Sequence, residues 1–579
     1  METIECDIVI LGSGIAGLTT AIHSSNESNR QLRISIVTKL HAMRSHSVAA
    51  EGGVSGVLYP EVSGDSIDLH AYDTVKGSDF LADQDAVEIL AKNAPEEIRF
   101  LDHLGVAWSR DEKGRILQRP FGGMSQPRTA FAQDKTGFFI MRALYDEISS
   151  HKNVSIFHEH FAYSLIIERG RFSGLVCMDL ASGESRFIKA KVCVIATGGA
   201  SRVYGFTTTS HSTTGDGIAL AYRAGIPLKD MEFVQFHPTA LVPNGILITE
   251  AARGEGAYLL NSKGKRFMED YAKSKMELAP RDIVSRAIIT EIEQGRGFTH
   301  TESGLKYVHL DLRHLGKKII DDHLPMIKEI SIKSIAIDPV DEPLPVRPAA
   351  HFTMGGINTD IHGRAVADEN GNVVKGVWAI GECGCVSVHG SNRLGSNSLS
   401  QCAVWGRLVG KQIAAYASSE GFNKGEAEKL AETERDRLEE LASRESGEDP
   451  YKIKEEMQEA MDEYLYVYRN RVGMTRAKDK IEQLKERFSN VYVKDKSRSF
   501  NTNLRDVLEI GNLLDIAEAI AIGAMHRKET RGAHAVVEYP KRNDKDWLKH
   551  TLIFKNRGKI GLAYIPVKIT KWKPVERVY

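Results

Sequence analysis

A histidine stands between two serines in a stretch made mostly of small residues. The segment from Arg44 to Gly53 reads RSHSVAAEGG, with His46 at its centre. Small side chains let a backbone pass close to a large flat group, which bulky side chains would prevent. The same residues also suit a polar loop that enters a glycine turn. The surrounding sequence therefore decides whether the stretch has a chemical role.

A second set of polar residues is spread among glycines and prolines further along the chain. Its segments are QFHPT at 235–239, TEAARGEG at 249–256 and APRD at 279–282, followed by HFTMGG at 351–356 and HGSNRLGSNSL at 389–399. This composition is typical of side chains held on loops for binding rather than of solvated helix faces. Arginine can bind a carboxylate through a bidentate fork, and histidine can donate a single hydrogen bond. We therefore expect binding residues in these segments.

The N-terminus predicts the scaffold for these groups. Residues 7–11 (DIVIL) form an apolar run typical of a buried parallel strand, and residues 18–22 read as the start of a helix. Between them lies GSGIAG, the GxGxxG pattern. Its glycines permit a tight turn and the close approach of a pyrophosphate, which the helix N-terminus stabilises. Strand, GxGxxG and helix in this order predict a dinucleotide-binding unit.

Other segments extend this prediction. The second strand, 34–37, ends in Thr38-Lys39 instead of the acidic residue that normally binds a ribose hydroxyl. The apolar run at 192–196 reads as a second buried strand and leads into glycines at 198–199. Residues 376–382 read as a strand that ends in an acidic residue, Glu382. Three short strands of a β-meander are expected at 154–157, 164–167 and 174–178, and helices at 65–104 and 423–524.

The composition describes an ordinary globular protein with several domains. The chain has 579 residues, a net charge of -1 and 26% charged residues. This balance gives no overall field to favour nucleic acid or an anionic membrane surface. No signal-peptide pattern is present, and no run approaches the roughly 18 apolar residues of a membrane helix. The six cysteines form no CxxC pair, so we expect a reduced chain without a metal site of its own.

The sequence resembles the flavoprotein subunit of succinate dehydrogenase and fumarate reductase along essentially its whole length. The resemblance rests on RSHS around His46, on the segments around His237, Arg281 and His351, and on NRLGSNSL at 392–399, which matches the NRLGxNSL motif of that family. Even Thr38-Lys39 fits, because the family carries a small polar residue and lysine there.

The resemblance implies an α/β fold with a Rossmann-like FAD-binding domain and an inserted α+β capping domain. The FAD-binding domain is expected at 1–235 and 351–420, with the capping domain at 236–350 between its two parts. A helical domain at 421–535 and a small C-terminal domain at 536–579 are expected to follow.

The resemblance also implies the chemistry, which is the interconversion of succinate and fumarate. The substrate would be bound by His237, Thr249, His351 and Arg393. Arg281 would transfer the proton, with Glu250 and Arg253 as its relay. An arginine with a pKa above about 12 is a poor base in water, so this role requires a dry site with a second cation nearby.

FAD is the cofactor that the resemblance implies, bonded covalently to His46. Glu382 is suited to its ribityl hydroxyls. The residues expected to hold FAD are Gly12, Ser13, Gly14, Ile15, Ala16, Gly17, Thr38, Lys39, Ser45, His46, Ser47, Glu51, Gly52, Gly53, Thr197, Gly198, Asp216, Glu382, Ser398 and Leu399.

Three alternatives remain at this stage: L-aspartate oxidase, a soluble fumarate reductase, and an inactive flavoprotein that serves as a scaffold. The first two share the fold but lack the flavin-linking histidine. The resemblance further implies an iron–sulfur partner subunit that takes the electrons. Membrane anchor subunits would then hold the complex on the cytoplasmic, inner face of the cell membrane or on the mitochondrial inner membrane. No nucleic-acid partner is expected.

Overall fold

The computed structural model describes residues 1–556 and 558–578. Within these residues a ten-stranded sheet forms the centre, in the order β1-β10-β9-β20-β11-β2-β3-β7 with β8 and β19 attached at its side. Its parallel core consists of β20 (Val373–Ala379), β11 (Val192–Ile195), β2 (Ile8–Leu11) and β3 (Ile34–Thr38). Every residue of β2, β3 and β11 is buried, as expected for strands covered on both faces.

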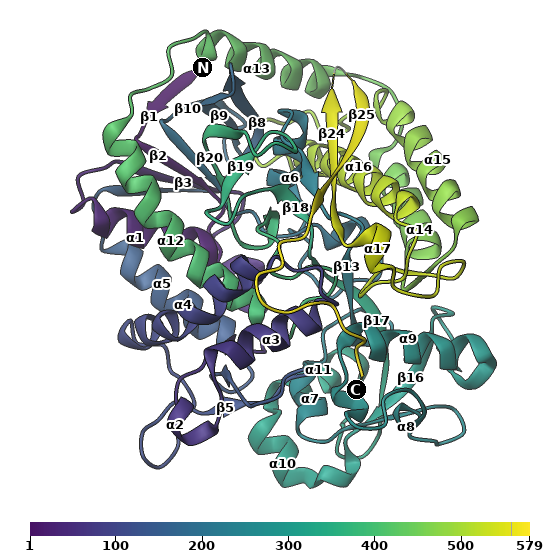
Figure 1. Cartoon of the computed structure of the whole chain (residues 1–579). Coiled ribbons are helices and arrows are strands. Elements are labelled where there is room, and N and C mark those ends of the chain that lie inside the picture. Colours follow the sequence, from purple (N-terminus) through teal and green to yellow (C-terminus); the bar gives the residue numbers. More distant parts are fainter. Residues whose placement is uncertain (557, 579) are drawn as a thin grey trace.

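Two helices pack closely beside this sheet (Figure 1). They are α1 (Ile15–Glu27), which follows β2, and α12 (Asn397–Ser419). A Cβ at Gly406 of α12 would lie 2.7 Å from the Cβ of Thr19 on α1, so only glycine allows this approach. The contact brings the start of α12, which carries the end of NRLGSNSL, to the GxGxxG turn before α1.

The predicted β-meander is partly wrong. The strands β8 (His160–Glu168) and β9 (Arg171–Asp179) are antiparallel neighbours, as expected. A third antiparallel neighbour, β10 (Ser185–Lys189), was not expected from the sequence. In contrast, β7 (Val154–His158) pairs in parallel with β3 at the edge of the central sheet. The reason is the preceding helix α5 (Thr136–Ser149), because a helical crossover returns the chain as a parallel strand.

Residues 234–353 build a second, antiparallel sheet, which we call the capping sheet. It is formed by β13 (Val234–Leu241), β17 (Leu344–Thr353), β16 (Lys306–Asp311), β14 (Tyr258–Leu260) and β15 (Phe298–Thr299). Helix α9 (Arg281–Glu291) lies against β13, where the Ser285 hydroxyl donates to the Phe236 carbonyl at 3.0 Å. The sheet and its helices occupy the lower right of Figure 1.

Long helices follow in the region expected to be helical. Helices α14 (Pro450–Tyr464), α15 (Arg471–Phe488) and α16 (Thr502–His526) pack together, whereas α13 (Ala427–Ser443) lies against β8 and β9. The C-terminal hairpin of β24 (Lys549–Asn556) and β25 (Lys559–Pro566) joins a sheet with β12 (Leu228–Lys229), β18 (Gly356–Asn358) and β21 (Gly384–Cys385). The hairpin thus shares its sheet with earlier parts of the chain, and the domain boundaries proposed from the sequence stay predictions.

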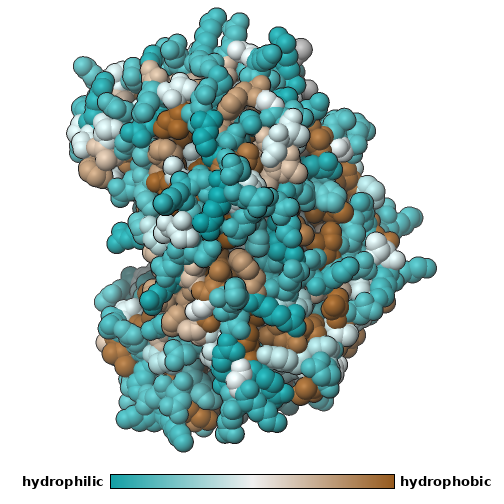
Figure 2. All heavy atoms as spheres, turned by 90° about the vertical axis from the view of Figure 1, so that its left-hand side faces the viewer, coloured by the Kyte–Doolittle hydropathy of each residue, from teal (hydrophilic) through white to brown (hydrophobic). Residues whose placement is uncertain are grey.

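The described helices and one face of the surface can be compared with what a membrane span requires. Among the described residues, no helix combines the length and apolar character needed to cross a membrane. On the face shown in Figure 2, hydrophobic residues lie in small scattered groups among hydrophilic ones. Such scattering is the ordinary state of a protein exterior.

Candidate active site

A cavity of about 710 Å³ extends from the GxGxxG turn to the capping sheet. It brings together residues that lie far apart in the sequence, from Gly12 to Leu399. All the predicted site residues line it except Gly17 and Arg253. Gly17 instead packs under the turn, where a Cβ would lie 2.1 Å from the Gly12 carbonyl oxygen. Arg253 lies behind Glu250, as described below.

The nucleotide end of the cavity is built by the turn between β2 and α1. Gly12 has a φ of +109°, and a Cβ there would lie 2.3 Å from the Ala196 carbonyl oxygen at the end of β11. Helix α1 starts after Gly14 with no side-chain cap and no acidic residue in its first turn. The Ile15 N–H donates to the Ser47 hydroxyl at 3.3 Å, and the start of the helix lines the cavity through Gly14, Ile15 and Ala16. The positive end of the helix dipole there fits the pyrophosphate of a dinucleotide.

The Thr38-Lys39 departure has a structural explanation. The hydroxyl groups of Thr38 and Ser13 are 2.8 Å apart, which ties the second strand to the GxGxxG turn. The ammonium group of Lys39 lies 2.7 Å from Asp216 and 2.6 Å from Glu509. Acidic residues are thus present at the end of the second strand, although the strand itself does not supply one. Asp216 comes from α6 (Asp216–Arg223) and Glu509 from α16. The sequence analysis missed Glu509, since nothing in the sequence connects α16 to this turn.

Glu382 lies where the central sheet meets the capping sheet. Its carboxylate accepts a hydrogen bond from the Thr353 N–H at 2.9 Å, and a Cβ at Gly199 would lie 2.1 Å from it. Burial raises the pKa of Glu382 to about 7. A carboxyl group near the midpoint of its titration can both accept from and donate to hydroxyl groups, which suits a polyol chain.

His46 sits on the short helix η2 (His46–Ala49), half-buried at the cavity wall. The Ser210 N–H donates to its Nδ1 at 3.4 Å. Removal from water and the nearby Arg202 cation lower the pKa of His46 to about 4. The imidazole is therefore neutral, with its proton on Nε2.

The cavity wall around His46 fits a large polar cofactor. Several buried polar atoms there have no partner within the described chain, namely Ser45 Oγ, Glu51 Oε2 and Ser396 Oγ. Buried polar groups are rarely left unpaired, so these atoms point to a bound group with donors and acceptors. The small residues noted in the sequence leave the space for it.

At the other end of the cavity, one carboxylate holds two arginines. Glu250 is the first residue of α7 (Glu250–Gly254), and it accepts from Arg281 Nε at 2.7 Å and from the Gly122 N–H at 2.5 Å. Arg253 Nη2 lies 3.6 Å from the same carboxylate. Burial disfavours the charged form, but Arg281 and Arg253 together lower the pKa of Glu250 to about 2. Glu250 is therefore ionised throughout the physiological range.

Arg393 adds a third cation without adding an acid. Its side chain is buried over the Phe352 ring, its Nη1 lies 3.3 Å from the Ser398 hydroxyl, and its Nε has no partner in the described residues. Burial and the Arg281 cation hold the pKa of Arg393 well below its usual range. An unmatched buried guanidinium is costly unless an anion joins it. The arrangement therefore calls for a carboxylate ligand.

Two neutral histidines face the same space. The rings of His237 and His351 are 5.0 Å apart. Removal from water and the Arg281 cation keep the pKa of both well below the usual value. The Thr239 N–H donates to His237 Nδ1 at 3.3 Å, which leaves the Nε2 proton free to donate. His351 Nδ1 lies 2.7 Å from the Thr208 hydroxyl, so each ring is oriented by a threonine.

The sequence analysis was wrong about the local structure at two of these positions. His237 and His351 were expected on loops, but they lie on β13 and β17 of the capping sheet. The strand β13 is buried along its length, and its pairing shifts on both sides of His237. The Pro238 that suggested a loop sits in this irregular part, since proline cannot complete a regular ladder.

Gln235 was missed as a site residue. Its Oε1 accepts from Arg281 Nη1 at 3.0 Å, and its Nε2 donates to the Arg393 carbonyl at 2.8 Å. One amide group thus links the two arginines that face the cavity. The only sequence feature that could have indicated Gln235 as a site residue was its position two residues before His237 in the same segment.

Comparison with known proteins agrees with this geometry. Residues 7–399 match the model of the FAD binding domain family, and residues 454–579 match the model described as fumarate reductase flavoprotein C-term. The chain is 44% identical over 593 residues to the fumarate reductase flavoprotein subunit of Mycobacterium tuberculosis, with 100% of both chains covered.

Two further relatives match at nearly full length. The succinate dehydrogenase flavoprotein subunit of Rickettsia conorii is 42% identical, covering 99% of this chain and 98% of its own. A solved structure of a mutated FrdA chain from E. coli quinol fumarate reductase superposes with a TM-score of 0.95 at 42% identity, covering 100% of this chain and 99% of that one. This chain therefore belongs to the family of fumarate reductase and succinate dehydrogenase flavoprotein subunits.

Proposed function

We propose that this chain is the catalytic flavoprotein subunit that interconverts succinate and fumarate, with FAD bound in the cavity. The observation that carries the proposal is a set of three buried arginines at the end of a dinucleotide-type cavity, two of which share the carboxylate of Glu250 while Arg393 has no ion-pair partner among the described residues. The bound flavin would supply a two-electron acceptor for hydride. The chain would bind the two carboxylates of the substrate and transfer the proton.

Arg393 and the two histidines are the proposed carboxylate binders. Arg393 offers a guanidinium that no acid in the described chain neutralises, and so it can form a bidentate pair with one carboxylate. His237 and His351, held neutral, can each donate one hydrogen bond to the other end, with Thr249 beside them. These fixed donors would orient the reacting carbons before chemistry occurs.

Arg281 is the proposed proton-transfer residue. Its Nε donates to Glu250 and its Nη1 donates to Gln235, whereas no partner for Nη2 is found in the described part of the chain. We assign the exchanged proton to Nη2. Glu250 and Arg253 lie directly behind, and Arg253 continues to the Glu277 carbonyl through its Nη1 at 2.5 Å. This line of donors and acceptors is the proposed relay.

His46 is the proposed attachment point for FAD. The neutral ring lines the cavity, and its Nε2 is the nitrogen left by the Ser210 contact at Nδ1. A bond from this nitrogen to the flavin would raise the reduction potential of the cofactor. A higher potential favours oxidation of a saturated carbon–carbon bond, because each 30 mV is worth about 1.4 kcal/mol for a two-electron couple.

Acid precipitation tests this assignment. Wild-type protein should keep its yellow colour in the acid pellet, and it should oxidise succinate with a soluble dye as acceptor. His46→Ser should retain FAD but release it in acid, still reduce fumarate from a strong donor, and oxidise succinate poorly. His41→Ser is the matched control, since His41 lines the same cavity and should leave the pellet yellow. Release of all flavin from the wild-type protein would refute the covalent link.

Succinate turnover by the same preparation separates the alternatives. L-aspartate oxidase and a soluble fumarate reductase are not favoured, because the full-length relatives at 42–44% identity are named as subunits of fumarate reductase or succinate dehydrogenase. An inactive scaffold would show no turnover at all. Efficient oxidation of succinate with covalently held flavin would exclude all three.

We further propose that electrons leave this chain through an iron–sulfur partner subunit. The structural relative belongs to a quinol fumarate reductase, which supports an assembly that reaches a membrane quinone through anchor subunits. The flavoprotein would then lie at the inner, cytoplasmic face of the membrane. The purified single chain should reduce a soluble dye with succinate but should not reduce quinone; rapid quinone reduction would contradict the partner.

A further inference from the structure

The end of the chain crosses from the C-terminal hairpin to the helix that carries Arg281. In Figure 1 the yellow tail leaves β25, passes over the front of the molecule and reaches α9. We call residues 567–578 the C-terminal strap. The strap lies at the junction between the FAD-binding part and the capping sheet, next to the proposed active site.

A buried glutamine fixes the middle of the strap. Gln84, the first residue of α4 (Gln84–His103), is 1% exposed. Its Oε1 accepts from the backbone N–H groups of residues 570, 571 and 572 at 3.1, 2.8 and 2.9 Å, and its Nε2 donates to the Trp572 carbonyl at 2.6 Å. Four hydrogen bonds from one buried side chain hold the strap backbone in one conformation.

Arg577 then joins two parts of the molecule. Its Nε lies 3.1 Å from Asp79, which follows α3 (Ile67–Gly77), and its Nη2 lies 2.6 Å from Asp282, the second residue of α9. The Asp282 side chain is 0% exposed, and those of Arg577 and Asp79 are 8% exposed. Burial works against ionisation of both acids, yet Arg577 and neighbouring arginines lower the pKa of Asp79 to about 2 and that of Asp282 below its usual value.

The same contacts form a closed ring of ion pairs and hydrogen bonds. The ring touches the two segments that carry Arg281 and Arg393. From Asp282 the ring continues to Arg286 at 3.0 Å, from Arg286 to the Gly532 carbonyl at 2.7 Å, and from the Gly532 N–H back to Asp79 at 3.1 Å. The first segment is α9, where Asp282 follows Arg281. The second segment contains Ser391, which precedes Arg393 by two residues. It packs closely against Gly532, because a Cβ at Gly532 would lie 2.3 Å from the Ser391 hydroxyl.

We propose that Arg577 is a positioning residue, which holds α9 against the Ser391–Arg393 segment so that Arg281 and Arg393 face the same dicarboxylate. This inference rests on the proposed function of the cavity. Without Arg577, two buried carboxylates lose their shared partner, and α9 stays joined to Asp79 only through Arg286 and Gly532. The two arginines then spend less time in the arrangement that binds both ends of the substrate.

Kinetics of the FAD-loaded, full-length protein test this role. If only a fraction of molecules is competent, the apparent affinity falls by that fraction, whereas saturating substrate restores the competent form. Arg577→Ala should therefore raise KM for succinate about tenfold, a change that corresponds to about 1.4 kcal/mol, while kcat and covalent flavin stay near wild type. A variant that is merely less stable would lose kcat at unchanged KM. Arg577→Lys keeps one charge at this position and should recover part of the loss.

Arg487→Ala is the matched control. Arg487 also forks between two acids from different segments, with Glu448 at 2.8 Å and Glu456 at 2.8 Å, but it lies among the long helices. Its removal should leave KM for succinate unchanged.

Hydrogen exchange supplies a readout that does not depend on turnover. Amides of residues 281–291 and 391–399 should exchange faster in Arg577→Ala than in wild type, and no faster in Arg487→Ala. Unchanged exchange in these segments, or a wild-type KM in Arg577→Ala, would overturn the proposal. If the wild-type protein failed to oxidise succinate, the proposed function would fall, and the exchange result would still decide whether Arg577 holds α9.

Discussion

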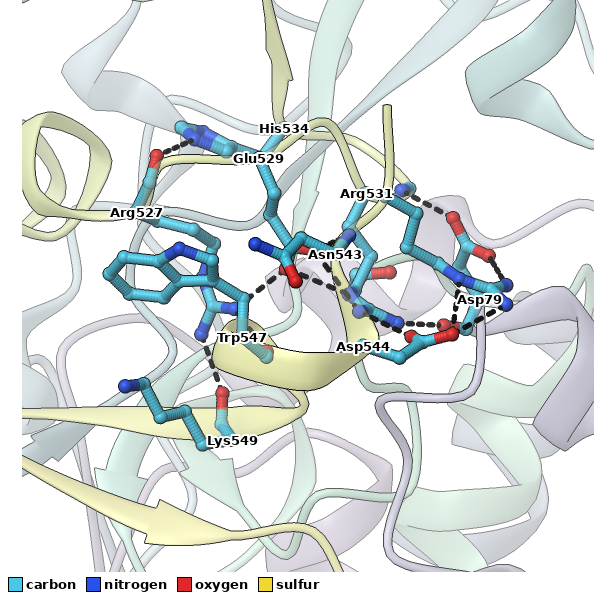
Figure 3. Close-up of polar contacts among 12 residues, drawn as sticks. Asp79, Arg527, Glu529, Arg531, His534, Asn543, Asp544, Trp547 and Lys549 are labelled. Atoms are coloured by element: carbon cyan, nitrogen blue, oxygen red, sulfur yellow. Dashed lines mark hydrogen bonds and ion pairs between the residues drawn. The ribbon is translucent and has the colours of Figure 1, made fainter. Parts of the chain in front are cut away.

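Two buried clusters of arginines and acids in this molecule differ in their charge balance. Figure 3 shows the first, in which Arg527, Glu529, Arg531 and Asp544 meet near the C-terminal hairpin. Arg527 pairs with Glu232 at 2.7 Å and with Glu529 at 3.0 Å, and Arg531 pairs with Glu529 at 2.8 Å. Each guanidinium there contacts two acids, Glu232 and Glu529 for Arg527 and Glu529 and Asp544 for Arg531. In the second cluster, at the cavity, Arg253 and Arg281 share Glu250, and Arg393 has no acid in contact within the described residues.

The difference is visible in the pKa values of the arginines. Burial lowers the pKa of Arg527, but Glu232 and Glu529 more than offset this effect and raise it. Arg393 is also buried, and its pKa stays well below its usual value because burial and the Arg281 cation together outweigh the carboxylates Glu382 and Glu250. A balanced cluster is satisfied by the protein itself and stabilises the fold. An unbalanced one is satisfied only when an anion binds, which is why it marks the substrate site.

The first prediction removes the central cation of the unbalanced cluster. Arg281→Ala should lower succinate turnover by about 10² to 10⁴-fold, the usual contribution of a positioned proton-transfer group. Its unfolding midpoint and flavin content should match wild type, because Glu250 keeps Arg253. Steady-state rates with a dye and a urea titration would check both parts. Arg313→Ala, an ion-paired and more exposed residue of the capping sheet region, should change neither.

The second prediction breaks the balanced cluster. Glu529→Ala leaves Arg527 and Arg531 without their shared acid, and loss of one partner from a buried ion pair costs about 3–5 kcal/mol. The urea midpoint should fall markedly, while KM for succinate in the folded protein stays near wild type. Glu529→Gln keeps the size of the side chain and isolates the charge. A urea midpoint within error of wild type in both variants would show that the charge of Glu529 does not stabilise the fold by pairing with Arg527 and Arg531.

The sequence was informative where chemistry depends on short motifs. Apolar runs before GxGxxG and after Lys191 predict buried strands, since a strand covered on both faces must be apolar throughout. Resemblance named Arg281, Glu250 and Arg393 from their motifs, and the structure places all three at one cavity.

The contacts that the sequence did not reveal are made between distant segments. Lys39 meets Glu509, Gln235 links Arg281 to Arg393, and Arg577 reaches Asp282 only because the chain folds back on itself. No local pattern encodes such a pair, because each residue by itself is an ordinary polar side chain. The prediction that β7 belongs to the β-meander was wrong for the same reason. Its actual parallel partner, β3, lies more than a hundred residues earlier.

The third prediction tests whether Arg393 lacks an internal partner. Arg393→Ala should weaken the binding of succinate or malonate by about 2–5 kcal/mol, because the carboxylate would lose its charged partner in a desolvated site. Its stability without ligand should be equal to wild type or higher, since a buried unmatched cation is removed. Flavin absorbance changes on malonate titration would give the affinity, and urea unfolding the stability. Unchanged malonate affinity would remove Arg393 from the site.

The last prediction compares histidines in the two kinds of surroundings. His237 at the cavity stays neutral, whereas His550 is completely buried between Asp230 at 2.6 Å and Asp83 at 3.2 Å. Burial opposes protonation of His550, but the two carboxylates outweigh it and raise its pKa to about 9. Protonated His550 therefore belongs to a balanced cluster.

The sign of the pH effect follows from this shift. A folded pKa of about 9 lies above the ordinary value of 6.5, so His550 contributes its full stability below pH 6.5 and loses it as pH rises through 9. One pKa unit is worth about 1.4 kcal/mol, which makes the whole effect about 3 kcal/mol. Urea midpoints of wild type and His550→Gln should therefore differ most near pH 6 and converge above pH 9. His237→Gln should show no such convergence, because His237 is neutral in the folded protein across that range. A difference between wild type and His550→Gln that stayed constant from pH 6 to pH 10 would mean that His550 is not charged in the folded protein, and the two Asp contacts would then have to be satisfied by a neutral ring.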